Sequence, residues 1–264
     1  MTFEKIRYEV DELKVATIVL DDPDTRNALG NEMLGELIGA FNQARTDERV
    51  RCVVLTSSHD KVFSAGGNLA GFAAEMPLVH KHFGTELFPM LFRTIGQLGK
   101  PTICAANGHV LAGSLGIALA CDLIVASRSA KFGLVEAVVG LTPSMGGTQR
   151  LAERAGSGRA RELVMTGELF TADELAAWNV VNRVFDDADF EERMRALVEK
   201  LAAGPTKAHA MTKHVVRRYV EGGVEAADEA IRADAGELFA TEDLQSAVET
   251  FLERGPGNAE FHNR

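Results

Sequence analysis

Two short turns rich in small residues are the first feature of this sequence with chemical meaning. One turn is residues 63–68 (FSAGGN), and the other is residues 112–114 (AGS), which open an apolar helical run. The first amides of a helix lack internal partners and lie at the positive end of its dipole. Small residues there let a ligand oxygen approach closely. Two such turns, each ending a strand, can direct two N–H groups at one oxygen, which is the geometry of an oxyanion hole.

The elements that must position these turns are strands that alternate with helices. Residues 6–10 alternate apolar and charged side chains, which predicts a half-exposed strand. Continuous apolar runs predict buried strands at 15–20, 51–56, 102–106 and 123–126. Asn31 is the predicted cap of a helix with apolar residues at helical spacing. This alternation predicts a parallel sheet with right-handed crossovers.

The second half of the chain is mainly helical. Thr171 and Glu174 have the spacing of a capping box, and residues 180–185 are predicted to form a last short strand. The predicted helices then cover residues 190–203, 205–221, 224–239 and 242–254. Residues 70–98 hold two prolines and scattered apolar residues, which indicates a partly helical lid over a pocket.

Composition narrows the class of protein. The chain has 264 residues, a net charge of −10 and no basic excess, which disfavours a nucleic acid or an anionic membrane as partner. Cys52, Cys104 and Cys121 each lie in an apolar run, so we expect buried, reduced thiols. The N-terminal residues show no signal pattern, and no apolar run has the length of a membrane span. We therefore expect a cytoplasmic protein.

Four segments together resemble the crotonase superfamily, which contains the enoyl-CoA hydratases and isomerases. They are FSAGGNL at 63–69, KPTICAANG at 100–108, ACDLIVA at 120–126 and the stretch from FGLVE to GGTQRL at 132–151. The resemblance implies an α/β, crotonase-like (ClpP/crotonase) spiral of ββα units with a C-terminal helical trimerisation region. We therefore expect a core with a CoA-ester site in residues 1–189 and an α-helical oligomerisation region in residues 190–264. The expected assembly is a homotrimer or a dimer of trimers.

The resemblance also implies the catalytic residues. Glu136 matches the second of two catalytic glutamates, although without the resemblance an exposed position is the simpler interpretation of a lone glutamate. Burial beside apolar neighbours is expected to raise its pKa toward the ~6–7 that suits a general acid or base. The N–H groups of Ala65 and Gly113 are the expected oxyanion donors. The first catalytic glutamate is missing, because the position three residues after Gly113 is Gly116.

This missing carboxylate decides which reaction the sequence predicts. Hydration of a 2-enoyl thioester normally uses two carboxylates to hold and activate one water, whereas one carboxylate suffices to move a proton from C2 to C4. We therefore predict isomerisation of a 3-enoyl-CoA to a 2-enoyl-CoA, with coenzyme A as part of the acyl-CoA substrate and no metal or redox cofactor. Three alternatives stay open. One is an enoyl-CoA hydratase that uses Glu136 with a water held by the backbone or by a lid residue such as Glu75 or Glu86. The others are a more specialised acyl-CoA reaction and a crotonase-fold protein that binds CoA esters without turnover.

Further residues are expected to contact the substrate. Arg26, Ala28 and Leu29 match a family segment that lies along the CoA, and Arg26 is a candidate partner of its phosphates. The first turn contributes Phe63, Gly66, Gly67 and Asn68. Phe251 and Arg254 resemble a terminal helix that touches the CoA of a neighbouring subunit, although core packing is the stronger interpretation of Phe251.

Four other side chains are interpreted without a catalytic role. His80 and His82 have no third ligand at a suitable spacing, so no metal site is predicted. His109 is expected to be structural. Ser114 has no partners for a hydrolase triad and is expected to serve by being small.

Overall fold

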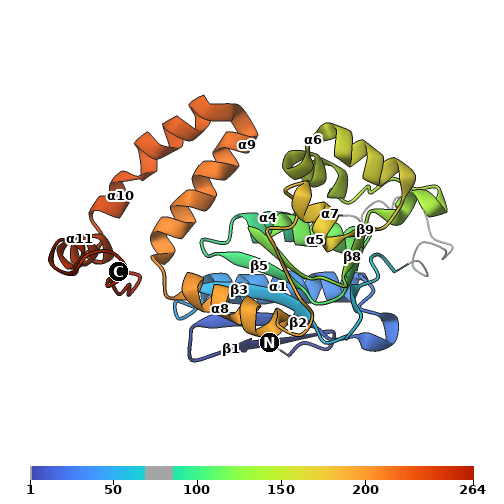
Figure 1. Ribbon diagram of the computed structural model, residues 1–264, viewed down its shortest axis with the longest axis horizontal. Helices are drawn as coiled ribbons and strands as arrows, with labels where there is room; N and C mark the ends of the chain where they lie inside the picture. The colour runs from blue at the N-terminus through green and yellow to red at the C-terminus, as the bar shows by residue number, and fades with distance from the viewer. Residues whose placement is uncertain (1, 69–85) are drawn as a thin grey trace.

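A computed structural model describes residues 2–68 and 86–264 of the chain (Figure 1). Over these residues the larger sheet has six strands in the order β1-β2-β3-β5-β7-β10, and only β1 runs antiparallel to its neighbour. The strands are β1 (Ile6–Val10), β2 (Val15–Leu20), β3 (Cys52–Ser57), β5 (Thr102–Ala106), β7 (Leu123–Ser127) and β10 (Arg183–Phe185). The parallel sheet predicted from the apolar runs is confirmed. Of the strand predicted at residues 180–185, only Arg183–Phe185 pairs with the sheet.

A second, smaller sheet has the order β4-β6-β8-β9 in the described part of the chain. Its strands are β4 (Val62–Ser64), β6 (His109–Leu111), β8 (Lys131–Gly133) and β9 (Phe170–Thr171). Three times the chain leaves a strand of the large sheet, forms a strand of the small sheet and then enters a helix. This is the spiral of ββα units that the resemblance implied. It places the ends of β4, β6 and β8 side by side, because the three strands are parallel neighbours.

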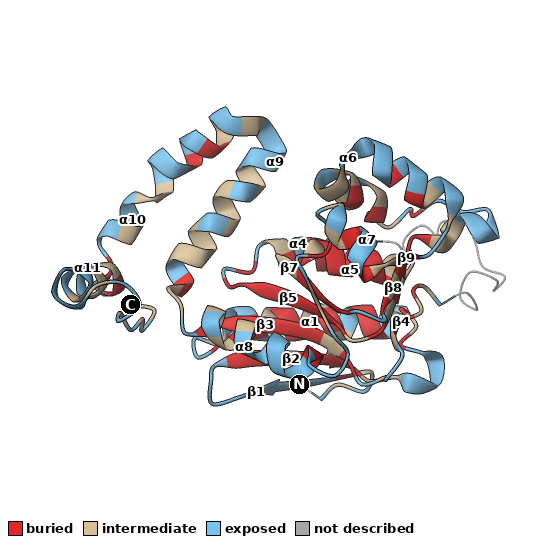
Figure 2. Ribbon diagram, in the orientation of Figure 1, coloured by how far each residue is buried: buried red, intermediate tan, exposed pale blue. Residues whose placement is uncertain are grey.

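Helices cover both faces of the large sheet. Period-two alternation sends Ala16, Ile18 and Leu20 of β2 into the main hydrophobic core and Val15 into a second, smaller one. The main core also packs α1 (Asn31–Thr46), α4 (Leu87–Gly96) and α5 (Gly113–Ala120). Figure 2 shows this buried interior between the sheet and the helices. The predicted cap Asn31 is instead the first residue inside α1, where Gly30 takes the cap position.

Further helices lie between and after these strands. They are the 3-10 helices η1 (Pro23–Thr25) and η2 (Val135–Val139), and the α-helices α6 (Gly147–Thr166), α7 (Ala172–Ala177) and α8 (Phe190–Ala202). The capping box of Thr171 and Glu174 is present at the start of α7. In α8, Phe190 and Val198 pack in the second core with residues of β2 and β3, so this helix belongs to the α/β core rather than to the helices that follow.

The last helices form an extension that we name the C-terminal arm, residues 206–264. It contains α9 (Thr206–Asp234), α10 (Gly236–Phe239) and α11 (Glu242–Arg254) (Figure 1). The break predicted at Gly222 and Gly223 appears as non-helical backbone inside α9. The guanidinium group of Arg51 donates to the carbonyl oxygens of Gly204 and Phe261, both at 2.6 Å, which ties the end of the arm to the core.

Candidate active site

The first turn follows β4 and is held by the buried amide of Asn27. The Asn27 Nδ2 donates to Ser57 Oγ at 2.8 Å and to the Phe63 carbonyl at 2.9 Å, and Asn27 Oδ1 accepts from the Asp22 N–H at 2.8 Å. The Ser64 hydroxyl in turn donates to the Asn27 carbonyl at 2.7 Å. Burial of polar groups is tolerated only when they are paired in this way. The residue 22–29 loop and the first turn therefore form one rigid unit, whose anchors Asn27 and Ser57 the sequence interpretation missed.

The second turn connects β6 to α5. Ala112 has a φ of 51°, and α5 begins at Gly113. The Ser114 Oγ accepts from the Leu111 N–H at 2.9 Å. Its single hydroxyl proton is shared between the Leu111 carbonyl at 2.7 Å and the Ser64 carbonyl at 3.1 Å. The prediction that Ser114 serves only by being small is wrong, because its hydroxyl ties the second turn to the first.

The two turns touch at Gly66, which has a φ of 88°. A Cβ added there would lie 2.6 Å from the Ala112 Cβ and 3.4 Å from the Gly113 nitrogen. Only glycine tolerates both this backbone conformation and so close an approach. The juxtaposition of the turns predicted from the sequence is therefore present.

The donor assigned to the first turn needs a correction. The Ala65 N–H already donates to the Arg26 carbonyl at 2.9 Å, so it is not available to a ligand. Gly67 forms a parallel bridge with Leu29. In this bridge the Leu29 N–H donates to the Gly66 carbonyl, and the Asn68 N–H donates to the Leu29 carbonyl. In such a bridge the N–H of the middle residue points away from the partner. Within residues 2–68 and 86–264, the Gly67 N–H has no acceptor.

The Gly113 amide is likewise unpaired among the described residues, as expected for the first residue of a helix. The turns thus present two unpaired N–H groups, those of Gly67 and Gly113. Donors fixed by the backbone need no reorganisation when charge develops on an oxygen near them.

Glu136 lies on η2, directly after β8. The Ala112 N–H donates to the Gly133 carbonyl at 2.7 Å, so the pairing of β6 with β8 brings η2 beside the second turn. Burial raises the pKa of the Glu136 carboxyl, and a hydrogen bond from its own backbone N–H opposes this shift. Its Oε2 is buried and has no partner in the part of the chain that is described. A partly desolvated carboxylate with one unpaired oxygen is suited to accept a proton from a bound molecule.

Gly116 lies on α5 one turn after Gly113. A Cβ added to Gly116 would meet the Phe92 Cζ at 3.3 Å and the Gly147 Cα and nitrogen at 3.6 Å. The nearest groups are therefore an aromatic ring and a helix start. No second carboxylate is among these nearest atoms.

The residues expected to contact CoA divide into three groups. Arg26, Ala28 and Leu29 lie beside the first turn. Arg26 is exposed and has a left-handed backbone, Ala28 is half-buried and Leu29 is buried. Asn68 is exposed at the end of the first turn. Phe63 is fully buried in the main core, so the prediction that its side chain binds substrate is wrong. Phe251 and Arg254 lie on α11, at the far end of the molecule from β8 (Figure 1). Phe251 is 57% exposed, which contradicts its interpretation as a core residue.

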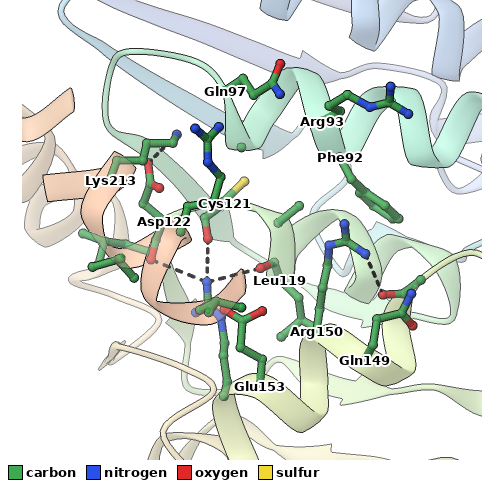
Figure 3. Close-up of a pocket in the computed structure, with 18 of the residues that line it drawn as sticks. Phe92, Arg93, Gln97, Leu119, Cys121, Asp122, Gln149, Arg150, Glu153 and Lys213 are labelled. Carbon is green, nitrogen blue, oxygen red and sulfur yellow. Dashed lines mark hydrogen bonds and ion pairs between the residues drawn. The ribbon is translucent and has the colours of Figure 1, made fainter. Parts of the chain in front are cut away.

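A cavity of about 870 Å³ opens on another side of α5, between α4, α6 and α9. Figure 3 shows Phe92 and Arg150 facing each other at one end of it and Lys213 beside Asp122 at the other. The Lys213 Nζ and Asp122 Oδ2 are 2.8 Å apart, and Arg154 donates to the last carbonyls of α5. Glu136 and the residues of the two turns are not among those that line this cavity.

Other predictions have mixed outcomes. Cys52, Cys104 and Cys121 are buried and free, and burial raises the pKa of Cys52 and Cys121 to about 12, which leaves these thiols unreactive. His109 accepts from the Lys131 N–H at 3.0 Å, in agreement with a structural role. Of the predicted lid, residues 87–96 form α4 and Glu86 is exposed, while Glu75, His80 and His82 lie outside the described residues.

Comparison with known proteins identifies the family. The sequence model of the enoyl-CoA hydratase/isomerase family matches residues 11–263. The chain belongs to this family. It is therefore an enzyme of the crotonase superfamily, as the resemblance implied.

Several relatives of this chain are named hydratases. A short-chain-enoyl-CoA hydratase of Clostridium acetobutylicum is 32% identical, with 92% of this chain and 93% of the relative covered. A 2,3-dehydroadipyl-CoA hydratase of Escherichia coli is also 32% identical, covering 91% of this chain and 93% of the relative. An enoyl-CoA hydratase structure from Geobacillus kaustophilus has a TM-score of 0.93 at 28% identity, with 100% of this chain and 98% of that chain covered. No helix within residues 2–68 and 86–264 is long and apolar enough to cross a membrane.

Proposed function

We propose that this enzyme moves the double bond of a 3-enoyl-CoA to give the 2-enoyl-CoA, with Glu136 as the sole acid and base. The observation that carries the proposal has two parts: the Glu136 carboxyl is partly desolvated with its Oε2 unpaired among the described residues, and position 116, where the resemblance places the first carboxylate of the hydratases, is a glycine. One carboxylate can carry a proton between two carbons. Holding and splitting a water at the same time requires a second group.

The thioester carbonyl oxygen accepts hydrogen bonds from the N–H groups of Gly113 and Gly67. These donors stabilise the negative charge that develops on this oxygen when a proton leaves C2, and each is typically worth about 2.7–4 kcal/mol in the transition state. Glu136 takes the C2 proton, the electrons shift through C3 to form the C2–C3 double bond, and Glu136 returns the proton to C4. The proton balance closes without water, a metal or a redox cofactor.

The CoA portion is proposed to lie along residues 26–29, next to the first turn. This loop is joined to the turn through Asn27, so CoA binding and the oxyanion donors share one framework. Arg26 is exposed and free to approach a phosphate. The alternative of a CoA-ester-binding protein without turnover has little support, since the chain belongs to a family of enzymes and retains Glu136.

Hydration of a 2-enoyl-CoA is the second candidate, and the names of the relatives favour it over isomerisation. Relatives at 32% identity over most of the chain are named hydratases. In this reaction water adds its hydroxyl to C3 and a proton goes to C2. The purified enzyme would then need a group other than residue 116 to hold the water.

An absorbance assay at the conjugated enoyl-thioester band separates the two reactions. With a 3-enoyl-CoA the proposal expects a rising signal, and with a 2-enoyl-CoA it expects no change. A falling signal with the 2-enoyl-CoA and none with the 3-enoyl-CoA would reject isomerisation in favour of hydration. Silence with both would reject both simple enoyl-CoA reactions and direct attention to a more specialised acyl-CoA.

A further inference from the structure

Ser64 lies at the point where the first turn, the second turn and the 22–29 loop meet. It is the last residue of β4 and is fully buried. Its hydroxyl donates to the Asn27 carbonyl of the loop at 2.7 Å and accepts from the Gly66 N–H of the first turn at 3.1 Å. Its carbonyl accepts from the Ser114 hydroxyl of the second turn at 3.1 Å. One buried serine therefore joins all three segments.

The Ser64 hydroxyl fixes the peptide unit between Ala65 and Gly66. The peptide units before and after this one each pair with the backbone of the 22–29 loop, at N–O distances of 2.9 and 2.7 Å. Within residues 2–68 and 86–264, the unit between Ala65 and Gly66 has one hydrogen bond, from the Gly66 N–H to the Ser64 hydroxyl. This single bond therefore orients the peptide that leads into the Gly67 donor.

The conformation of Gly66 does not fix this peptide by itself. Gly66 has a φ of 88°, and glycine populates positive and negative φ about equally readily. A serine hydroxyl that bonds to the backbone two residues later is a common way to hold such a turn. Without this bond the planar peptide can rotate, and rotation at Gly66 displaces the N–H of Gly67, the next residue.

We propose that Ser64 is a positioning residue of this enzyme, whose hydroxyl holds the first turn in the conformation that directs the Gly67 N–H at the thioester oxygen. This inference rests on the proposed function for the assignment of Gly67 and Gly113 as donors. It applies to isomerisation and to hydration alike, because negative charge develops on the thioester oxygen in both reactions. Since Ser64 is fully buried, it acts through Gly67 and not by contact with the substrate.

Ser57 provides a matched control in the same network. It is also a buried serine bonded to Asn27, because its Oγ accepts from the Asn27 Nδ2 at 2.8 Å. The Ser57 hydroxyl donates to the Val62 carbonyl at 3.1 Å and accepts from the His59 N–H at 3.0 Å, and none of these partners belongs to the first turn. Ser57→Ala therefore removes a comparable buried hydroxyl and leaves the bond on the Gly66 N–H intact.

The test measures the thioester carbonyl band of a bound ligand by infrared difference spectroscopy. The ligand is a saturated acyl-CoA with an isotope-labelled thioester carbonyl, which has no double bond to move or hydrate. Hydrogen bonds to the carbonyl oxygen polarise the carbonyl and lower the frequency of its band, so the band reports directly on the two donors. Wild type, Ser64→Ala and Ser57→Ala are compared.

Two further measurements accompany the spectra. The values of kcat and KM are determined for each protein with the enoyl-CoA that the wild type converts, and thermal melting reports whether each variant is folded. Ser64→Cys replaces Ser64→Ala if the alanine variant does not fold, because a thiol fills the site but is a weak hydrogen-bonding group.

We expect Ser64→Ala to remove about half of the wild-type frequency shift, because one of two donors is displaced, and to lower kcat about tenfold with less than about a threefold change in KM. Ser57→Ala should keep the wild-type band and kcat. A folded Ser64 variant with the wild-type band, or an equal loss in the Ser57 variant, would overturn this proposal and leave the donors assigned. A wild type whose bound carbonyl is not shifted defeats the donor assignment of the proposed function, and this proposal with it.

Discussion

The Ser114 hydroxyl oxygen lies 3.1 Å from the carbonyl oxygen of Ser64, 50 residues earlier in the chain. This contact joins the strand end that carries Gly67 to the helix start that carries Gly113. The spacing of two backbone donors that must meet one oxygen therefore depends on a side chain that takes no part in the chemistry. Donors displaced even slightly lose much of their effect on a developing charge.

Replacement of Ser114 by alanine is expected to lower kcat about tenfold with a smaller change in KM. The free energy of unfolding should fall by about 1–3 kcal/mol, because the partly buried Leu111 N–H loses its acceptor. Steady-state kinetics and urea unfolding measure the two effects. Ser58→Ala, at an exposed serine, is the control and should leave both unchanged. A Ser114 variant with wild-type kcat would show that the tether has no role in catalysis.

Glu136→Gln is expected to lower kcat by about 10²–10⁴-fold while the dissociation constant for the CoA ester changes little. The amide keeps the shape of the side chain but cannot accept the C2 proton. Stopped-flow or absorbance kinetics measure the first quantity and calorimetry the second. Glu48→Gln, at an exposed glutamate, serves as the control. Full activity of Glu136→Gln would exclude this residue as the base.

The raised pKa of Glu136 predicts an unusual dependence of stability on pH. Between the lower pKa of the unfolded chain and the raised pKa of the folded protein, the folded state binds more protons, so stability falls as pH rises through this window. Glu136→Gln removes the penalty and should melt at a higher temperature than the wild type at neutral pH. Below the unfolded-state pKa both forms are uncharged at this position, so the difference should vanish. Melting curves at several pH values check this, and a constant difference would contradict it.

Gly66→Ala and Gly35→Ala should have opposite effects on stability. A Cβ at Gly66 would lie 2.6 Å from the Ala112 Cβ, in a backbone conformation with φ of 88°, so folding should be weakened by at least about 2 kcal/mol and activity lost. Gly35 is exposed inside α1 with nothing within 4 Å of an added Cβ, and alanine there should stabilise by about 0.5–1 kcal/mol. Denaturant unfolding of both variants measures these changes.

The C-terminal arm is expected to build a homotrimer or a dimer of trimers. In the single chain, the C-terminal arm carries exposed apolar side chains, including Phe239 at 74%, Phe251 at 57% and Leu252 at 79% exposure. Large exposed apolar surfaces of this kind usually lie in subunit contacts. Sedimentation velocity should give the mass of three or six chains, and Phe239→Glu should shift the distribution toward smaller species. A wild-type monomer at micromolar concentration would contradict the prediction.

Much of the fold follows from local pattern. The apolar runs at residues 15–20 and 102–106 match β2 and β5, and the last predicted helix matches α11, because strand and helix periodicity are local properties of the chain. The strand predicted at residues 180–185 is shorter than expected. Val180 and Val181 are buried, yet their N–H groups both donate to the Leu175 carbonyl at the end of α7, so apolar character there reflects packing rather than strand pairing.

For the site, the sequence by itself determined that two small-residue turns and one glutamate exist, and that position 116 carries no carboxylate. It also determined the family, through motifs in a set order. Only the tertiary structure decided that the Ala65 N–H is occupied by Arg26 and that Gly67 is the unpaired donor, since hydrogen-bond partners 39 residues apart leave no local pattern. The same holds for Phe92 beside Gly116: the contact depends on how α4 packs on α5, which side-chain volume and shape determine in three dimensions.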